Sequence, residues 1–220
     1  MPRPSAGSRA NPLAATSGAI EHLRTADPVM AGLVERIGDP TAVAARRDRP
    51  GDAYGALLRA IVGQQLSTIA ARTIYGRLTE RFGNRTPTPR ELLDDDPEEL
   101  RAVGLSRAKV AYLRDLAEHV EDGELDLERL AELPDERVIE QLTAIKGLGR
   151  WTVDMFLLFH LGRPDVLAVG DLGIRRAAQE AYDLEELPDA AELERIAEPW
   201  RPHRSLACLY LWRSLDNTPA

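Results

Sequence analysis

A glycine pair inside a run of helix-forming residues could bind a phosphate group. The stretch from Leu142 to Phe159 reads LTAIKGLGRWTVDMFLLF, with apolar positions at helical spacing that are interrupted once, at Gly147-Leu148-Gly149. The backbone N–H groups that open a second helix lack intrahelical partners, and glycine has no Cβ to block a close approach. The pattern therefore predicts a helical hairpin whose turn either binds backbone phosphate or simply reverses the chain.

The residues around this turn fit phosphate binding. Ile145 and Leu148 would anchor the turn to the core, while Lys146 and Arg150 would add positive charge beside it. Such contacts position a duplex without reading its sequence. The net charge of −8 argues mildly against nucleic acid as a partner, although fields act locally and basic side chains cluster in the C-terminal half. Composition thus leaves DNA binding open.

Cysteine and histidine usage excludes several kinds of cofactor. Cys208 is the only cysteine, so one chain cannot build a disulfide or a four-cysteine metal or iron–sulfur site. The four histidines are scattered, and no pair has the spacing of zinc ligands. The sequence has neither a membrane-spanning apolar run nor the apolar core of a secretory signal. We expect a cytoplasmic protein with no organic cofactor and no membrane partner.

The periodicity predicts an all-α fold. Residues 1–18, rich in Pro, Ser, Gly and Ala, lack periodicity and are expected to form a flexible tail. Helix starts are marked by caps such as Asp27 before Pro28, and helix ends by glycines. VLAV at 166–169 could be a short strand, but no other segment offers it a partner. The expected helices cover 28–38, two segments within 53–83 divided near 63–67, 89–94, 97–102, a turn and helix within 104–123, 125–133, 134–145, 150–161, 172–182, 189–198 and 203–215.

The hairpin sequence resembles a motif of DNA repair. L-T-A-I-K-G-L-G-R-W-T-V is similar to the helix-hairpin-helix of the base-excision DNA glycosylases, and Asp171 follows Trp151 by twenty positions, where that superfamily has a catalytic aspartate. IVGQQLS, GLSRAKV, a Gly-Asp-Leu-Gly-Ile stretch and WRPHRSLACLYLW narrow the resemblance to the 3-methyladenine DNA glycosylase II family. These stretches lie within residues 61–212, and the chain resembles the short form without an N-terminal β domain.

The resemblance implies roles for the side chains of an active site. Asp171 would stabilise the oxocarbenium-like sugar as the bond to an alkylated base breaks, and from its position it is also expected to cap the helix that follows. Asp154 is the rival acid, which we interpret as structural. Trp151, Met155 and Trp212 would form the pocket for an electron-poor base, although core packing is the usual role of such residues.

Further contacts to DNA follow from the same resemblance. Gln65 would fill the space left by the flipped base, and Leu105 would press on the opposite strand. The phosphate would contact the turn formed by Lys146, Gly147, Leu148, Gly149 and Arg150.

The resemblance also bears on metals and on strand cleavage. The backbone carbonyls of Thr143, Ile145 and Gly147 match positions at which the family binds a monovalent cation, sodium or potassium. Relatives that also cleave the strand carry a lysine immediately after GxGR, where this chain has Trp151, so we expect no lyase activity. The lone Cys208 excludes the iron–sulfur branch.

These features predict two helical subdomains with an active-site cleft between them. One comprises 19–52 with 164–220, and the other comprises 53–163 and ends in the helix-hairpin-helix at about 138–161. We expect a monomer that flips 3-methyladenine or 7-methylguanine out of double-stranded DNA and hydrolyses its glycosidic bond, the first step of base excision repair. The alternatives are a non-catalytic helix-hairpin-helix DNA-binding protein and a glycosylase for oxidised or deaminated bases.

Overall fold

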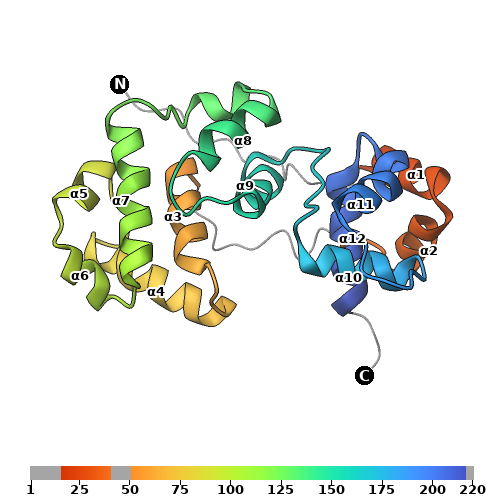
Figure 1. Cartoon of the computed structure of the whole chain (residues 1–220), viewed down its shortest axis with the longest axis horizontal. Helices are drawn as coiled ribbons and strands as arrows, with labels where there is room; N and C mark the ends of the chain where they lie inside the picture. Colours follow the sequence, from red (N-terminus) through yellow and green to blue (C-terminus); the bar gives the residue numbers. More distant parts are fainter. Residues whose placement is uncertain (1–15, 41–50, 217–220) are drawn as a thin grey trace. The chain divides into compact units, whose positions relative to one another are not determined.

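The chain folds into helices that form two compact units (Figure 1). The computed structural model describes residues 16–40 and 51–216, and within these ranges every regular element is a helix, as predicted. The central unit comprises 48–156, and the terminal unit comprises 1–47 with 157–220. Both divisions fall about six residues earlier than the sequence suggested. No helix in the described part is long and apolar enough to cross a membrane.

Helix α7 organises the central unit. It packs against α3, α5 and α6, while α3 also contacts α4 and α9 (Figure 1). Leu113 and Leu116 of α7 and Leu57 and Ile61 of α3 are fully buried between these helices. The unit contains α3 (Ala53–Gly63), α4 (Thr68–Arg81), α5 (Pro89–Asp94), α6 (Pro97–Ala102), α7 (Arg107–Glu121), a 3₁₀ turn (Arg129–Glu132), α8 (Asp135–Thr143) and α9 (Arg150–Phe156).

Side-chain caps begin these helices where the sequence predicted them. The hydroxyls of Ser67 and Ser106 accept hydrogen bonds from the third backbone N–H of α4 and of α7. Thr88 and Glu91 form a reciprocal capping box at α5, and Asp96 caps α6. Each cap satisfies an N–H group that the helix itself leaves without a partner.

The prediction of a helix over 125–133 is wrong. Only Arg129–Glu132 is helical, and it forms a single 3₁₀ turn. The Asp126 carboxylate accepts hydrogen bonds from the backbone N–H groups of Glu128 and Arg129, at 3.1 and 3.3 Å. This side-chain turn replaces the first turn of an α-helix. The segment ends at Leu133, whose extended backbone is what a following proline favours.

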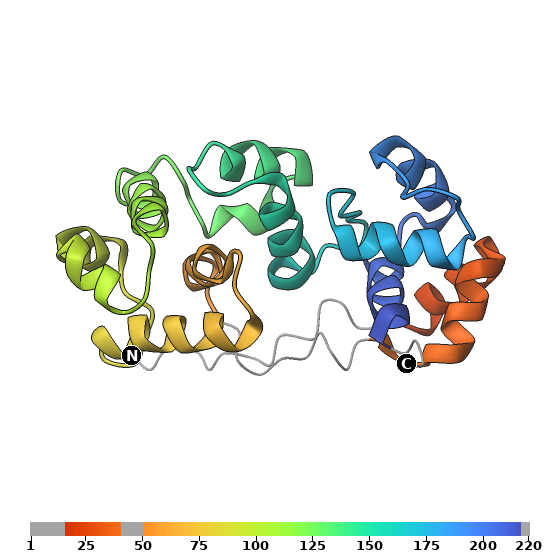
Figure 2. The same cartoon turned by 60° about the horizontal axis from the view of Figure 1, so that its bottom comes forward.

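The terminal unit joins both ends of the described chain. The Asp27 carboxylate caps α2 and also accepts hydrogen bonds from the Tyr182 hydroxyl and from Trp200 Nε1. Helix α12 packs on α2 and on α10, which lies across it in Figure 2. The unit contains α1 (Ser17–Ala26), α2 (Pro28–Ile37), a π-helical turn (Leu157–Leu161), α10 (Leu172–Ala181), α11 (Ala190–Ala197), a 3₁₀ turn (Glu198–Trp200) and α12 (Arg204–Asp216).

The structure of this unit differs from the sequence-based expectation at α1 and at 166–169. Helix α1 was not among the predicted helices and begins at Ser17, two residues before the expected tail ends, because Thr16 caps it. The rest of that tail, residues 1–15, lies outside the described residues, as do residues 41–50. The segment 166–169 is a loop rather than a strand.

Candidate active site and nucleic-acid interface

Asp171 begins helix α10 in the terminal unit. Its Oδ1 accepts a hydrogen bond of 2.9 Å from the backbone N–H of Ile174, so the residue is a helix cap, as predicted. The same oxygen accepts a second hydrogen bond, also 2.9 Å, from Nε1 of Trp212 on α12. Two donors on one oxygen fix the orientation of the carboxylate. A fixed carboxylate can stabilise positive charge that develops beside it without first having to reorient.

Trp212 reaches the aspartate because its surroundings leave room for the indole. A Cβ added to Gly173 would lie 3.0 Å from Asp171 Oδ1 and 3.2 Å from Trp212 Cδ1, tighter than ordinary contact distances. The ring of Phe159 stacks on the indole, with centroids 5.7 Å apart and an interplanar angle of 24°. Gly173 and Phe159 therefore position the Trp212–Asp171 pair, and neither was identified from the sequence.

The glycine turn in the central unit is tightly built. Gly147 has a φ of +83°, a conformation that side chains disfavour, and a Cβ there would lie 2.3 Å from the Tyr112 ring. Ile145 and Leu148 are each 2% exposed, which confirms that they anchor the turn to the core. Gly149 differs, since a Cβ at this position would meet nothing within 4 Å. The first glycine is thus required by the protein itself, while the second leaves space above the start of α9.

The basic residues beside the turn are paired with buried acids. The Lys146 ammonium donates to Asp115 Oδ1 at 2.6 Å, and its backbone N–H donates to Oδ2 at 2.9 Å. Burial alone would raise the pKa of Asp115, but the two hydrogen bonds from Lys146, together with nearby positive charge, lower that pKa. The Lys146 side chain remains 74% exposed, so its charge lies at the surface although it is partly neutralised.

Arg150 forms a similar pair with Asp154 along helix α9. Its Nε donates to Asp154 Oδ1 at 2.8 Å, while the guanidinium side chain is 56% exposed. Asp154 is fully buried, and its Oδ2 has no hydrogen-bond partner among the described residues. Burial raises the pKa of Asp154, and the Arg150 charge opposes that effect. This placement supports the interpretation of Asp154 as a structural residue that orients Arg150.

The aromatic residue predicted for the base pocket of this unit is accessible. Trp151, in the first turn of α9, is 46% exposed, which is unusual for so large an apolar side chain. Met155 follows it by one helical turn and is partly exposed. Both side chains therefore project from the same face of α9, as the spacing predicted.

The two predicted intercalating residues differ in exposure. Gln65 lies between α3 and α4, is exposed, and has a φ of +57°, which is rare for a residue other than glycine. Leu105 is only 5% exposed. The exposed apolar side chains near Gln65 are instead Leu66, at 37%, and Ile69, at 81%.

The three carbonyls expected to hold a monovalent cation surround the same turn. The Ile145 carbonyl accepts the Leu148 N–H at 3.1 Å, and the Gly147 carbonyl accepts the side-chain amide of Gln64 at 2.6 Å. A carbonyl oxygen has two lone pairs, so both can still accept a cation. Among the described residues no cluster of three or more His, Cys, Asp or Glu side chains could hold a metal.

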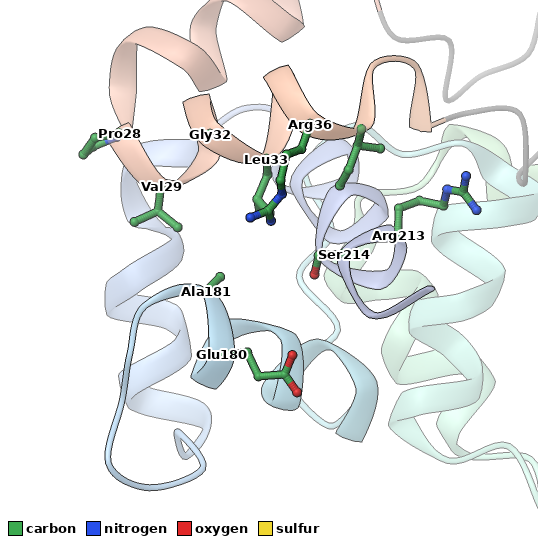
Figure 3. Close-up of a pocket in the computed structure, with 10 residues that line it drawn as sticks. Pro28, Val29, Gly32, Leu33, Arg36, Glu180, Ala181, Arg213 and Ser214 are labelled. Atoms are coloured by element: carbon green, nitrogen blue, oxygen red, sulfur yellow. The ribbon is translucent and has the colours of Figure 1, made fainter. Parts of the chain in front are cut away.

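A pocket of about 910 Å³ opens between α2, α10 and α12 of the terminal unit (Figure 3). It lies at the C-terminal end of α10, whereas Asp171 precedes the N-terminus of that helix, about 15 Å away at 1.5 Å per residue. None of the predicted site residues lines it. The lining residues are Pro28, Val29, Gly32, Leu33, Arg36, Ile37, Glu180, Ala181, Arg213 and Ser214.

Comparisons with known proteins identify the family of the chain. Residues 58–202 match the family model "HhH-GPD superfamily base excision DNA repair protein". DNA-3-methyladenine glycosylase 1 of Schizosaccharomyces pombe is 39% identical over 163 residues, which cover 73% of this chain and 72% of that protein.

Two solved structures are similar over almost the whole chain. The 3-methyladenine DNA glycosylase Mag1 of Schizosaccharomyces pombe, in complex with abasic DNA, has a TM-score of 0.81 and 34% identity, covering 91% of this chain and 97% of that one. A DNA-3-methyladenine glycosidase of Bacillus halodurans has a TM-score of 0.80 and 37% identity, covering 91% and 90%. The chain therefore belongs to the HhH-GPD superfamily of base excision DNA repair proteins, and within it to the DNA-3-methyladenine glycosylases.

Proposed function

We propose that this protein is a monofunctional DNA glycosylase that removes 3-methyladenine and 7-methylguanine from duplex DNA, with the carboxylate of Asp171 as its catalytic group. The observation that carries the proposal is the hydrogen bonding of Asp171, whose Oδ1 is held by both Ile174 N–H and Trp212 Nε1. A relative 39% identical over 163 residues is named as a DNA-3-methyladenine glycosylase, which supports the substrate class.

The carboxylate of Asp171 acts on the sugar. As the bond between sugar and base lengthens, positive charge develops on the sugar ring, and a carboxylate next to the anomeric carbon stabilises it. The carboxylate can also orient the attacking water. An alkylated purine already carries positive charge and leaves readily, so no second acid has to protonate it. Trp151, Met155 and Trp212 would contact the extruded base, because indole faces attract electron-poor rings.

The central unit would bind the DNA backbone. The N–H groups at the start of α9 lie beside Gly149, where even an added Cβ would meet no other atom within 4 Å, so a phosphate can approach the turn closely. Arg150, held by Asp154, would supply charge to the same phosphate. Gln65, exposed between α3 and α4, would occupy the space that the flipped base leaves.

The absence of lyase activity forms part of the proposal. Strand cleavage by a Schiff base needs a lysine amine at the sugar. The chain has two lysines, Lys109 and Lys146, and both donate hydrogen bonds to other residues of the central unit. Trp151 stands at the position where a lyase would carry its lysine.

The proposal includes a monovalent cation and a monomeric state. Sodium or potassium would bind the carbonyls of Thr143, Ile145 and Gly147 and bridge them to a DNA phosphate. DNA affinity should then fall when potassium is replaced by a bulky organic cation at equal ionic strength. One chain carries the candidate residues of both units, which supports a monomer.

Base release from methylated duplex DNA tests the function. The wild-type protein should release 3-methyladenine and 7-methylguanine, identified by chromatography, and leave the strand uncut. Asp171→Asn should reduce release by orders of magnitude while DNA binding persists. Asp183→Asn is a matched control, because Asp183 is exposed with a φ of +51° and asparagine tolerates that conformation.

The other outcomes would assign a different function. A protein that binds DNA but releases no base would be a non-catalytic helix-hairpin-helix protein. A protein that releases only oxidised or deaminated bases would be a glycosylase for those lesions rather than for alkylated bases.

A further inference from the structure

One face of helix α7 contacts both of the DNA-binding elements of the central unit. Lys109, Tyr112, Asp115 and His119 are spaced three or four residues apart, so they lie along the same side of the helix. Tyr112 lies against Gly147, and Asp115 holds Lys146. This part of the face therefore supports the glycine turn.

Lys109, one turn earlier on the same face, supports the segment that presents Gln65. Its ammonium donates two hydrogen bonds of 2.7 Å each, to the carbonyls of Val62 and Gln64. These carbonyls lie at the C-terminal end of α3, where a cation is favoured because the last carbonyls of a helix lack partners. Burial lowers the pKa of Lys109, which is the cost of placing an ammonium in this position.

A third contact joins the two supported segments directly. The side-chain amide of Gln64 donates to the Gly147 carbonyl at 2.6 Å. Gln64 and Gly147 are 83 positions apart in sequence, and α7 lies between them in the chain. The three segments are therefore all connected by hydrogen bonds. Lys109 of α7 bonds to the loop at Gln64, Gln64 bonds to the turn at Gly147, and Asp115 of α7 bonds to the turn at Lys146.

The backbone conformation of Gln65 requires support from these hydrogen bonds. Its φ of +57° is unfavourable for glutamine, and such a conformation persists only when the surroundings determine it. Lys109 donates to the carbonyl of Gln64, the residue immediately before Gln65, and to that of Val62. The ammonium therefore restricts the peptide that sets the direction of the Gln65 side chain.

We propose that Lys109 is a positioning residue for base flipping: it holds Gln65 in place and couples it, through Gln64, to the phosphate-binding turn. The inference rests on the proposed glycosylase function and adds to it a residue that touches neither substrate nor reacting atoms. If Lys109 served only to stabilise α3, its loss would lower all activities together.

The test compares excision of a paired and a mismatched lesion. Flipping costs a few kcal/mol for a paired base and less for a mismatched one. Lys109→Met should lower the single-turnover excision of 7-methylguanine paired with cytosine by about tenfold or more, and excision from a mismatch with adenine by much less. The affinity for undamaged duplex and its dependence on salt should stay unchanged, because the turn keeps its contacts to Tyr112 and Asp115.

Two variants define the expected pattern. Gln65→Ala should show the same selective loss, and combining it with Lys109→Met should add little, because both act on one step. Lys109→Arg should recover part of the paired-lesion activity, since the guanidinium can also donate to two carbonyls. Arg107→Met is the matched control, because it removes one positive charge from the exposed side of the same helix.

The outcomes separate the two proposals. Equal losses on the paired and mismatched lesions would overturn the role of Lys109 while leaving the glycosylase intact. A wild-type protein that releases no methylated base would overturn the proposed function and this inference with it. If Lys109→Met does not fold, as judged by its thermal unfolding, Gln64→Leu must show the same selective loss, because it breaks the coupling to Gly147 from the other side.

Discussion

The proposed catalytic aspartate and the glycine turn are held in very different ways. Oδ1 of Asp171 accepts hydrogen bonds from one backbone N–H and one indole. The turn is fixed by the Tyr112 ring beneath Gly147, by the ion pair between the exposed Lys146 and the buried Asp115, and by the amide of Gln64. One carboxylate needs only an orientation, whereas a turn proposed to bind a DNA phosphate through its backbone needs rigidity over several residues. Substitutions around Asp171 should therefore change rate, and those around the turn should change stability and binding.

Substitution of the two glycines of the turn should affect stability very differently, and this is the largest effect on stability that we expect. Gly147→Ala places a Cβ 2.3 Å from the Tyr112 ring at a φ of +83°. The strained conformation costs about 1–2 kcal/mol and the steric overlap adds about 1–3 kcal/mol, so unfolding in urea should begin at much lower concentration. DNA binding should be lost with the shape of the turn.

Gly149→Ala is the matched control for that prediction. Its Cβ would meet nothing within 4 Å, so the free energy of unfolding should change by less than about 0.5 kcal/mol. DNA affinity should nevertheless fall, because a methyl group would stand where the phosphate approaches. If Gly149→Ala binds duplex DNA as tightly as the wild type, the turn does not bind phosphate.

The indole that contacts Asp171 provides the next prediction. Trp212→Phe keeps an aromatic ring beside Phe159 but removes the Nε1 donor to Oδ1. With one of its two donors gone, the carboxylate is less well oriented, and the maximal excision rate should fall by about 10- to 100-fold. The free energy of unfolding should change by only about 1 kcal/mol, the usual net value of one hydrogen bond. A stability loss as large as that of Gly147→Ala would contradict the contrast between the two regions.

Local sequence patterns predicted the parts of the site that depend on near neighbours. The hairpin, the buried Ile145 and Leu148 and the cap at Asp171 follow from helical periodicity and from capping preferences, and the structure confirms them. Family resemblance added the candidates Trp151 and Gln65, whose exposure is compatible with contact to DNA.

Contacts between distant segments could not be predicted in this way. Trp212 bonds to Asp171 across 41 positions, and Gln64 bonds to Gly147 across 83. Neither pairing leaves a periodic signal. A signal did exist for α7, where Lys109, Tyr112 and Asp115 form a polar stripe at helical spacing beside the apolar residues that the helix buries. Polar residues on an inward face indicate specific partners, because burial without them is costly.

Removing the ion pair between Asp115 and Lys146 should give the smallest change in the free energy of unfolding. The lowered pKa of Asp115 determines how that change depends on pH. A carboxyl whose pKa is lower in the folded than in the unfolded state stabilises the fold at pH values above its unfolded pKa, about 3.9. That stabilisation is lost as the pH falls through the lower, folded value. Asp115→Asn lacks it at every pH, so the variant should be less stable by about 1 kcal/mol at pH 7.

Urea unfolding at several pH values checks the sign. The difference in free energy of unfolding between wild type and Asp115→Asn should shrink as the pH drops below about 4, because the wild type then protonates the same group. Lys146 and His119 are the basic side chains that face Asp115, and the Lys146 ammonium, which donates to it, stays charged over this range. A difference that stays constant down to acid pH would show that Asp115 supports the turn by packing and neutral hydrogen bonds rather than by its charge.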